Sequence, residues 1–380
     1  MRILTLSCEY PPIGGGGATA CAILAEALVG KGHEVDIVTA GMDDLPRCEH
    51  RAGVRILRAR GRRRWRHYSS ALEQASFVLP MGWLAARLLR ERRYDVIHCH
   101  FVVPTGLIAY VLARRSGVPY MLTAHGSDIP GYNPERFQLL HRLIHPAWSR
   151  ILQGAAAVTV PSDFLAQLIR KRSQVPVLGI PYPFSGREPV RVPRRRRVLV
   201  AARLVERKGV QHVLSALAGH DLDWEVVIAG DGPSRPWLEQ LAAEHQVRAS
   251  FVGFLPRNEL AAIYASSAIF VLPSRRENMP MVLLEAMAAG CAVVTTSNTG
   301  CAEAVGDAGL LVDPGDVEGL RRSLFRLMAD EELRSLYAAR GRRRMGDFAA
   351  PRVASRFVDL FGSIVAPRYG GQAPCDGIPV

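Results

Sequence analysis

The chain has 380 residues, 48% apolar and 22% charged, and carries a formal net charge of +13. It is too long for one ordinary hydrophobic core, so we expect two domains. No apolar run reaches the roughly 18–20 residues that a membrane-spanning helix needs, and the first residues lack the pattern of a signal peptide. We therefore expect a cytoplasmic protein, whose seven cysteines, without disulfide-like spacing, are reduced.

The positive charge is concentrated in four arginine-rich runs, at 58–68, 87–93, 193–197 and 340–344. Such runs attract phosphorylated substrates, nucleic acid or acidic lipid, but arginines on a solvated surface explain each run equally well. The sign of the charge alone therefore selects none of these partners.

Short apolar strands alternate with helical patterns along the first half of the chain. The strand "RILTLS" at 2–7 precedes a glycine-rich turn, a helix over about 18–31 and a strand at 33–40. Further elements are predicted in the order strand 94–101, helix 104–116, strand 119–126, strand 155–162 and a helix that starts near Phe164. This alternation is typical of βαβ units around a parallel sheet.

Residues 176–196 carry five prolines and no helical period, which is typical of a connector. The alternation then resumes, with strands expected at 197–204, 224–232, 248–255, 268–274, 291–296 and 309–315. We therefore predict an α/β fold with two doubly wound parallel-sheet domains. The boundaries that we assign are a first domain at 1–180, a linker at 181–196, a second domain at 197–350, a C-terminal helix at 351–369 that crosses back to the first domain, and a loose tail at 370–380.

Open parallel sheets bind ligands at the carboxyl ends of their strands, so the expected site lies in a cleft between the two domains. One strand end is followed by "RRENMPMVLLEAMAAG" at 275–290. Pro280 fits the first position of a helix and Gly290 fits a left-handed C-cap. The helix start would then offer an anion site suited to a diphosphate, formed by the N–H groups of Met281, Val282 and Leu283.

Two acids flank this helix start. Glu277 would reach hydroxyl groups near a reacting carbon and Glu285 would lie over a sugar ring, because carboxylates accept paired hydroxyl hydrogen bonds. Spacing alone favours an ordinary loop acid and an ordinary surface acid. However, "ARLVERKG" at 202–209 adds Arg203 and Lys208 at another strand end, where two cations could neutralise charge on a departing phosphate. Together these features favour the functional interpretation.

Five motifs in this order resemble glycosyltransferase family 4. They are the glycine loop "IGGGG" at 13–17, "HGSD" at 125–128, Arg203 with Lys208-Gly209, "GDGP" at 230–233, and Glu277 followed by Glu285. The resemblance covers about residues 1–365. It implies the GT-B fold, retaining transfer from a nucleotide-sugar donor, an acceptor side in the first domain and a nucleotide-sugar site in the second.

The resemblance also implies a role for each matching residue. Arg203 and Lys208 contact the donor diphosphate, and Glu277 contacts hydroxyls of the transferred sugar. His125 contacts the sugar from the first domain, while Asp128 steadies the loop of His125. Glu285 contacts the ribose, and Gly15 and Gly16 contact the phosphate or the acceptor. The remaining residues contact the donor; they are Asn278, Met279, Pro280, Met281, Val282, Leu283 and Gly230.

One stretch departs from the family. Many members have an Asn-Gly turn after the proline that begins the connector, whereas this chain reads "IPYPFSG" at 180–186. We assign no role to Tyr182 or Phe184.

The mechanism that the resemblance implies is front-face attack, in which the leaving phosphate takes the proton of the acceptor. No cluster of metal-binding carboxylates is visible, and "HCH" at 98–100 offers only two histidine ligands. Two cations can replace a metal, so we expect a metal-independent hexosyltransferase without a cofactor. The acceptor stays open between a lipid-linked, a glycan and a small-molecule hydroxyl.

Residues 58–93 suggest a second hypothesis. This segment could form an amphipathic helix with arginines beside Trp83, Leu84 and Leu88, suited to an anionic membrane surface at the inner face of a cell membrane. A core-facing helix with solvated arginines explains the pattern as well.

Three other readings of the chain stay open. A sugar-nucleotide epimerase, a phosphorylase or an inactive relative could share the fold, because function depends on the site. A nucleic-acid-binding protein would explain the positive charge, but it would not explain the glycines, acids and cations at strand ends, so we expect no nucleic acid as partner.

Overall fold

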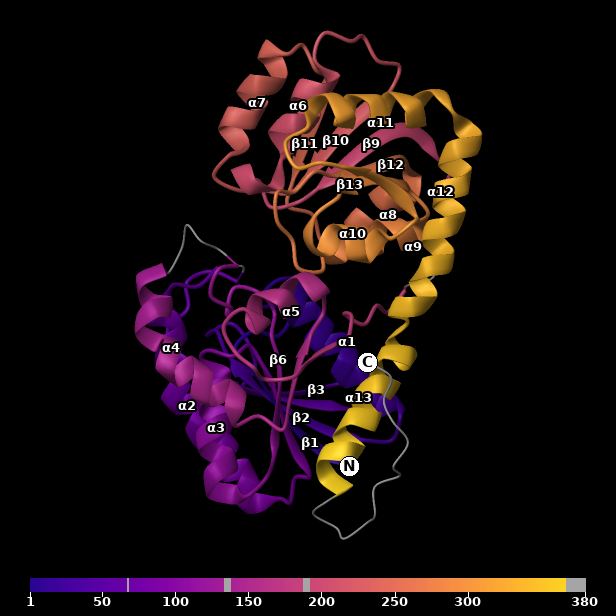
Figure 1. The fold of residues 1–380 in the computed structure, drawn as a ribbon. Coiled ribbons are helices and arrows are strands. Elements are labelled where there is room, and N and C mark those ends of the chain that lie inside the picture. Colours follow the sequence, from indigo (N-terminus) through magenta and orange to yellow (C-terminus); the bar gives the residue numbers. More distant parts are fainter. Residues whose placement is uncertain (67, 133–137, 187–191, 367–380) are drawn as a thin grey trace. The chain divides into compact units, whose positions relative to one another are not determined.

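The structure of the chain, a computed structural model, describes residues 1–66, 68–132, 138–186 and 192–366. It contains two compact units, each built around a parallel sheet (Figure 1). Unit 1 comprises Met1–Pro183 and the segment from Ala350, and unit 2 comprises Phe184–Ala349. The predicted α/β fold with two doubly wound domains is confirmed. The predicted tail at 370–380, the end of the helix at 351–369 and part of the linker lie outside the described residues.

The sheet of unit 1 has eight strands in the order β3-β4-β2-β1-β5-β6-β7-β8. Neighbouring strands are parallel, except that β3 and β4 form an antiparallel pair. The strands are β1 (Arg2–Ser7), β2 (Glu34–Ala40), β3 (Cys48–Arg51), β4 (Val54–Ala59), β5 (Val96–His100), β6 (Tyr120–Thr123), β7 (Ala157–Val160) and β8 (Val177–Gly179). Strand β8 lies within the stretch that the prolines had marked as a connector, and the hairpin of β3 and β4 was not predicted.

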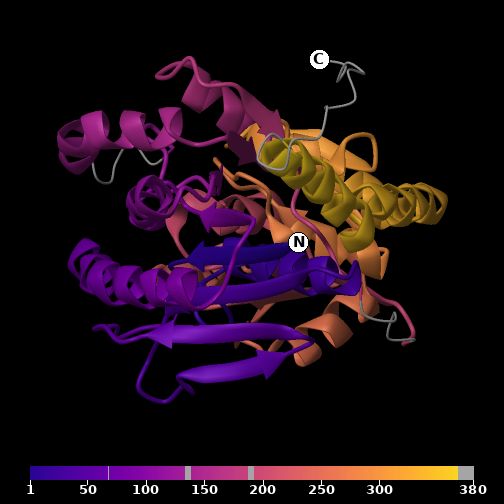
Figure 2. The ribbon, with the colours of Figure 1, turned by 90° about the horizontal axis from the view of Figure 1, so that it is seen from below.

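Helices cover both faces of this sheet (Figure 2). On one face, α1 (Gly16–Gly30) packs with α13 (Ala350–Val365), whose apolar residues recur with helical spacing and include buried Val353, Phe357 and Phe361. The other face is covered by α2 (Ala71–Glu91), α3 (Thr105–Ser116), α4 (Gln138–Gln153) and α5 (Asp163–Arg170). Because both faces are buried, strands such as β5 carry apolar residues toward each side.

Unit 2 contains a six-stranded, fully parallel sheet in the order β11-β10-β9-β12-β13-β14. Its strands are β9 (Arg195–Ala201), β10 (Glu225–Ala229), β11 (Ala249–Gly253), β12 (Ser267–Leu272), β13 (Ala292–Thr296) and β14 (Gly309–Val312). Its helices are η1 (Glu206–Lys208), α6 (Val210–Leu217), α7 (Arg235–Glu244), α8 (Arg257–Ser266), α9 (Met281–Ala289), α10 (Thr299–Val305), α11 (Val317–Ala329), α12 (Glu331–Arg344) and η2 (Met345–Phe348).

Unit 2 begins and ends at one point of its surface. The amide of Phe184 donates to the carbonyl of Phe348 at 2.7 Å, and Phe184 forms an isolated bridge with Ala349. The chain then continues into α13 of unit 1. No helix of the described ranges is long and apolar enough to cross a membrane, and the six cysteines described there form no disulfide.

Candidate active-site residues

The candidate residues of unit 2 follow adjacent strands. Strands β9 and β12 are neighbours, so the loops at their carboxyl ends lie side by side. Lys208 of η1 and Glu277 of the loop after β12 form an ion pair between Nζ and Oε1. Both side chains are largely buried, with exposed fractions of 14% and 9%. Arg203 also follows β9 and is exposed.

The loop that carries Glu277 is held on two sides. On one side, the amide of Arg275 donates to the carbonyl of Arg207 at 2.9 Å. On the other side, the Glu277 amide donates to Oγ1 of Thr299 at 3.2 Å, and the Gly300 amide donates to the Glu277 carbonyl at 3.1 Å. Both backbone polar groups of Glu277 are therefore bound by the first two residues of α10.

Helix α9 starts one residue later than we expected. Pro280 is its N-cap with extended backbone, and its carbonyl accepts a hydrogen bond from the Leu283 amide at 3.0 Å. The prediction that Leu283 offers a free N–H is therefore wrong. Met281 and Val282 are the first two helical residues, whose amides have no acceptor within the helix.

Both ends of α9 are otherwise as the sequence indicates. Gly290 ends the helix in the left-handed conformation, with φ of 76°, which confirms the predicted cap. Asn278 and Met279, which lie between Glu277 and the helix in the sequence, are buried.

Glu285 lies in the second turn of α9. Its carboxylate is 3.7 Å from Nη2 of Arg257 in α8. Burial raises the pKa of Glu285, and the charge of Arg257 and an interaction with the Tyr264 hydroxyl oppose this rise only in part. Glu285 is thus a partly buried acid beside one cationic side chain, Arg257.

Gly230 sits where two loops press together. Its φ is +130°, and a Cβ atom there would be 1.9 Å from the carbonyl oxygen of Ala202. Close backbone packing directly before Arg203 therefore requires glycine at this position.

The candidate residues of unit 1 form a separate buried network. Nε2 of His125 lies 2.9 Å from Nδ1 of His100, and Nδ1 of His125 lies 2.6 Å from the hydroxyl of Tyr182. Both ring nitrogens of His125 are therefore engaged within unit 1. The Asp128 carboxylate accepts from three amides, those of Val102 at 2.8 Å, His125 at 3.1 Å and Gly126 at 2.8 Å.

Burial lowers the pKa of each histidine in this region. The pKa of His100 falls to about 3, and those of His98 and His125 fall well below their ordinary value. The imidazoles are consequently neutral at physiological pH. His98 bonds Oγ1 of Thr123 at 2.8 Å, and among the described residues no group of three or more metal-binding side chains gathers here or elsewhere.

The glycine loop of unit 1 approaches His125 at one position. A Cβ atom at Gly17 would be 2.9 Å from Nδ1 of His125, whereas one at Gly15 would meet open space. Gly15 is the N-cap of α1 and Gly16 is its first residue. Sequence reasoning selected Gly15 and Gly16 and missed Gly17, because a run of four glycines does not reveal which of them packs.

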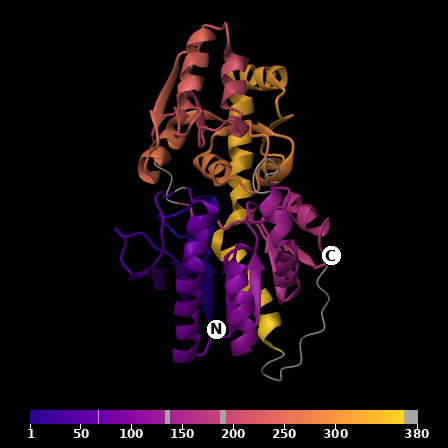
Figure 3. The ribbon, with the colours of Figure 1, turned by 90° about the vertical axis from the view of Figure 1, so that its left-hand side faces the viewer.

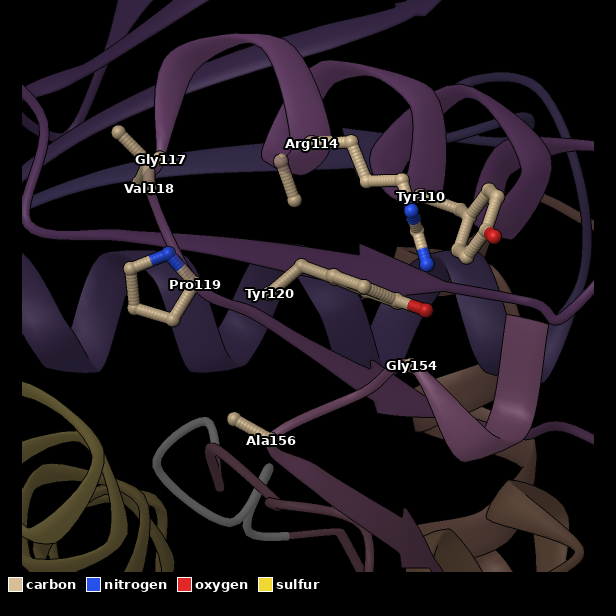
Figure 4. A pocket seen from close by; sticks show the side chains of 9 residues that line it. Tyr110, Arg114, Gly117, Val118, Pro119, Tyr120, Gly154 and Ala156 are labelled. Atoms are coloured by element: carbon tan, nitrogen blue, oxygen red, sulfur yellow. The ribbon is translucent and has the colours of Figure 1, made fainter. Parts of the chain in front are cut away.

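A cavity of about 380 Å³ lies elsewhere in unit 1 (Figure 4). It is lined by Tyr110, Arg114 and Tyr120, and the Arg114 guanidinium lies 5.2 Å from the ring centre of Tyr110. Tyr120 starts β6, whereas His125 follows the end of that strand. The cavity is therefore at the amino-terminal edge of the sheet and does not include the candidate residues.

The comparisons with known proteins agree with this fold and these motifs. Residues 14–178 match the model of Glycosyltransferase Family 4, and residues 186–344 match that of Glycosyl transferases group 1. A glycosyltransferase of Methanocaldococcus jannaschii is 30% identical over 87% of this chain and 90% of its own length. The protein is thus a glycosyltransferase of the GT-B class, and it belongs to glycosyltransferase family 4 as the sequence motifs predicted.

Other relatives and solved structures extend the likeness over the whole chain. Glycogen synthase of Mycobacterium tuberculosis is 29% identical and covers 100% of this chain and 98% of its own. Sucrose-phosphate synthase of Thermosynechococcus elongatus has a TM-score of 0.80 at 23% identity, covering 97% of this chain and 100% of that chain. The Anabaena protein HepE, solved with UDP, has a TM-score of 0.75 at 18% identity, with coverages of 96% and 100%.

Proposed function

We propose that this glycosyltransferase is a retaining, metal-independent hexosyltransferase that moves a sugar from a nucleotide diphosphate sugar to an acceptor hydroxyl. The observation that carries the proposal is the Lys208–Glu277 pair at the carboxyl ends of β9 and β12. Glu277 lies in the loop that leads into α9, and Lys208 reaches it from η1, so a cation, an acid and a helix start are brought together.

Lys208 can serve the acid and the donor at once. An ammonium group has three donors, of which one holds Glu277, leaving two for phosphate oxygens. In this proposal the amides of Met281 and Val282 and the side chain of Arg203 complete the diphosphate site. Glu277, held by Lys208, accepts hydrogen bonds from the hydroxyls of the transferred sugar, and Glu285 binds the ribose.

The proposed mechanism depends on charge. Cleavage of the glycosidic bond leaves extra negative charge on the departing diphosphate, and the cations and helix amides bind that charge more strongly in the transition state than in the ground state. The leaving phosphate takes the proton of the acceptor hydroxyl, on the face where the acceptor attacks. In this proposal His125, a neutral imidazole held by Tyr182 and His100, contacts the transferred sugar.

Known proteins support a nucleotide-sugar donor. HepE of Anabaena has also been solved with UDP-glucose, and the catalytic domain of starch synthase IV from Arabidopsis thaliana with ADP and acarbose. Relatives such as the N-acetyl-alpha-D-glucosaminyl L-malate synthase of Bacillus anthracis, 25% identical, act on a small-molecule acceptor by name. For the present chain we propose a lipid-linked, glycan or small-molecule acceptor.

We further propose that the enzyme acts in the cytoplasm and associates peripherally with the inner face of a cell membrane through residues 58–93. A lipid-linked acceptor would be presented at that surface. The charge of this segment supports the proposal, since it has ten arginines and two glutamates.

The test is a thermal-shift panel of nucleotide diphosphates and nucleotide sugars, followed by NMR of the product formed from the donor that stabilises most. We expect release of a nucleoside diphosphate and a product whose anomeric configuration equals that of the donor. Inversion would contradict the retaining mechanism. Epimerised sugar nucleotide without release, or turnover that requires inorganic phosphate, would favour the epimerase or the phosphorylase.

A further inference from the structure

An apolar stripe lies on the outward face of α2, a helix that runs beside α3 in front of the sheet of unit 1 (Figure 3). Leu72, Leu79 and Trp83 have exposed fractions of 84%, 83% and 61%. Their spacing of seven and four residues places them on one helical face. The buried residues of α2, including Phe77 and Met81, lie on the opposite face and fill the core. We call Leu72, Leu79 and Trp83 the α2 stripe.

The structure changes which residues of this segment could meet a membrane. Leu88 is buried and Leu84 packs against the core, so the sequence-based grouping of these two leucines with Trp83 on the membrane side is wrong. Two of the arginines are also unavailable. Arg58 is buried against Glu49, and Arg63 has 1% of its side chain exposed and contacts Glu9.

Exposed arginines nevertheless flank the stripe at both ends. Near the start of α2, the Arg62 amide donates to Oγ of Ser76 at 3.0 Å, and the Arg64 amide donates to the Glu73 carboxylate at 2.9 Å. At the other end, Arg90 lies on the stripe's face five helical turns after Leu72. Among the described residues of the segment 58–93, the exposed arginines that form no ion pair are Arg60, Arg62, Arg64, Arg90, Arg92 and Arg93.

We propose that the α2 stripe inserts into the interfacial layer of an anionic phospholipid membrane, with the flanking arginines bound to lipid phosphates. Helices that lie in this layer combine an apolar face with basic residues, and tryptophan favours the same depth. A second copy of the chain is a poorer occupant, since it would bring together two segments with the same large excess of positive charge. The inference deepens the membrane part of the proposed function but does not depend on the transfer reaction.

The test is sedimentation of the full chain with vesicles, in the absence of any sugar donor. We expect binding to phosphatidylcholine mixed with phosphatidylglycerol and little binding to phosphatidylcholine alone. The variant Leu79→Ser/Trp83→Ser should bind the mixed vesicles on the order of tenfold more weakly. Arg90→Ser should weaken binding about fivefold. The matched controls, Trp237→Ser and Leu336→Ser on exposed positions of unit 2, should bind like the wild type.

Each other outcome overturns the inference. Equal binding of the stripe variant and the wild type would mean that the arginines alone bind any polyanion. Stripe-dependent dimers in light scattering without vesicles would make a second copy the occupant. Because no donor is present, loss of vesicle binding leaves the proposed transfer reaction untouched, and an inactive enzyme that still binds vesicles leaves this inference untouched.

A second inference rests on the backbone of Thr299. This β-branched residue has φ of +60°, a conformation that such side chains rarely adopt and that tends to persist at functional sites. Its Oγ1 accepts a hydrogen bond from the Glu277 amide. The next residue, Gly300, packs so closely that a Cβ atom there would be 1.2 Å from the carbonyl oxygen of Asn278. The side chain of Asn298 also donates to the carbonyl of Arg275 at 3.3 Å.

We infer that Thr299 is a positioning residue for Glu277, on the basis of the proposed role of that acid. Removal of the acceptor at Oγ1 would free the Glu277 amide and let the carboxylate drift from Lys208. Thr299→Val keeps the branched shape and removes the oxygen, whereas Thr299→Ser keeps the oxygen. The side chain of Thr299 itself is not expected to contact the donor.

Steady-state kinetics separate the possibilities. Thr299→Val should lower kcat about tenfold or more with a smaller change in KM, and Thr299→Ser should restore most of the rate. Equal kcat values for the wild type and Thr299→Val, in an active enzyme with unchanged melting temperature, would overturn the inference. An inactive wild type would instead contradict the proposed function, and the melting temperature separates misfolding from both.

Discussion

Lys208 and Glu277, 69 residues apart in the sequence, form a largely buried ion pair at the carboxyl edge of the unit 2 sheet. Removing one partner should leave the other charge buried and unpaired. We expect Lys208→Met to lower the free energy of unfolding of unit 2 by about 3–5 kcal/mol. The double variant Lys208→Met/Glu277→Gln should recover most of this loss while staying inactive. Urea denaturation followed by circular dichroism measures both. Equal stability of the single and double variants would show that the two charges do not interact.

Arg203→Ala tests the electrostatic part of the proposed mechanism. If the guanidinium stabilises the leaving diphosphate in the transition state, kcat should fall by about 10²–10³-fold while donor affinity changes much less. Arg207→Ala is the control, since the contact of Arg207 with the Glu277 loop comes from its backbone carbonyl. Kinetics with calorimetry of donor binding give the two quantities. A change confined to affinity would remove Arg203 from the leaving-group role.

Chelation tests the expected independence from metal. Transfer by enzyme that was dialysed against EDTA should proceed at the untreated rate, because Lys208 and Arg203 supply the positive charge in the proposal. Product formation without added magnesium is the measurement. Loss of activity that magnesium restores would refute the prediction.

We expect Glu285 to lower the stability of the fold at neutral pH and to strengthen binding of a nucleoside diphosphate. Burial raises its pKa above the ordinary 4.5, so the folded state holds this proton more tightly than the unfolded state and loses stability as pH rises above about 4.5. We expect Glu285→Gln to melt at a higher temperature than the wild type at neutral pH, and at the same temperature in acid below 4.5. Its affinity for a nucleoside diphosphate should fall. Glu332→Gln, at an exposed position, is the control and should change neither quantity.

The buried histidines of unit 1 predict sensitivity to acid. Because burial lowers the pKa of His98, His100 and His125, the unfolded chain gains protons below about pH 6.5 that the folded unit does not take up. Stability is therefore complete above 6.5 and falls as pH drops toward about 3. His100→Asn should make the urea midpoint less steep against pH. An identical slope would show that His100 takes up its proton in the folded state.

The sequence predicted the order of the strands along the chain but not their order within each sheet. Apolar strands, a proline before α9 and a glycine after it identify local structure because each acts within a few residues. That Lys208 meets Glu277 depends on β9 lying next to β12, which the alternation of elements does not specify. The hairpin of β3 and β4 escaped prediction because its strands are short and partly exposed.

Several contacts were missed because they depend on how distant residues pack, which the sequence does not show. Tyr182 was set aside because its stretch departs from the family, yet its hydroxyl bonds His125. Thr299 gave no signal, since a left-handed threonine cannot be recognised from its neighbours in the sequence. Leu84 and Leu88 were grouped with Trp83 on the membrane side, whereas packing on the sheet buries Leu88 and places Leu84 against the core.

Helix α13 has a consequence for biosynthesis. It is the last described helix to leave the ribosome, yet Phe357 and Phe361 complete the core against α1 and β5, which were made first. Unit 2 is continuous and can fold during translation, whereas the part of the unit 1 core that α13 covers stays exposed until α13 has been made. Nascent or prematurely terminated chains should therefore expose that part of the core and become clients of chaperones.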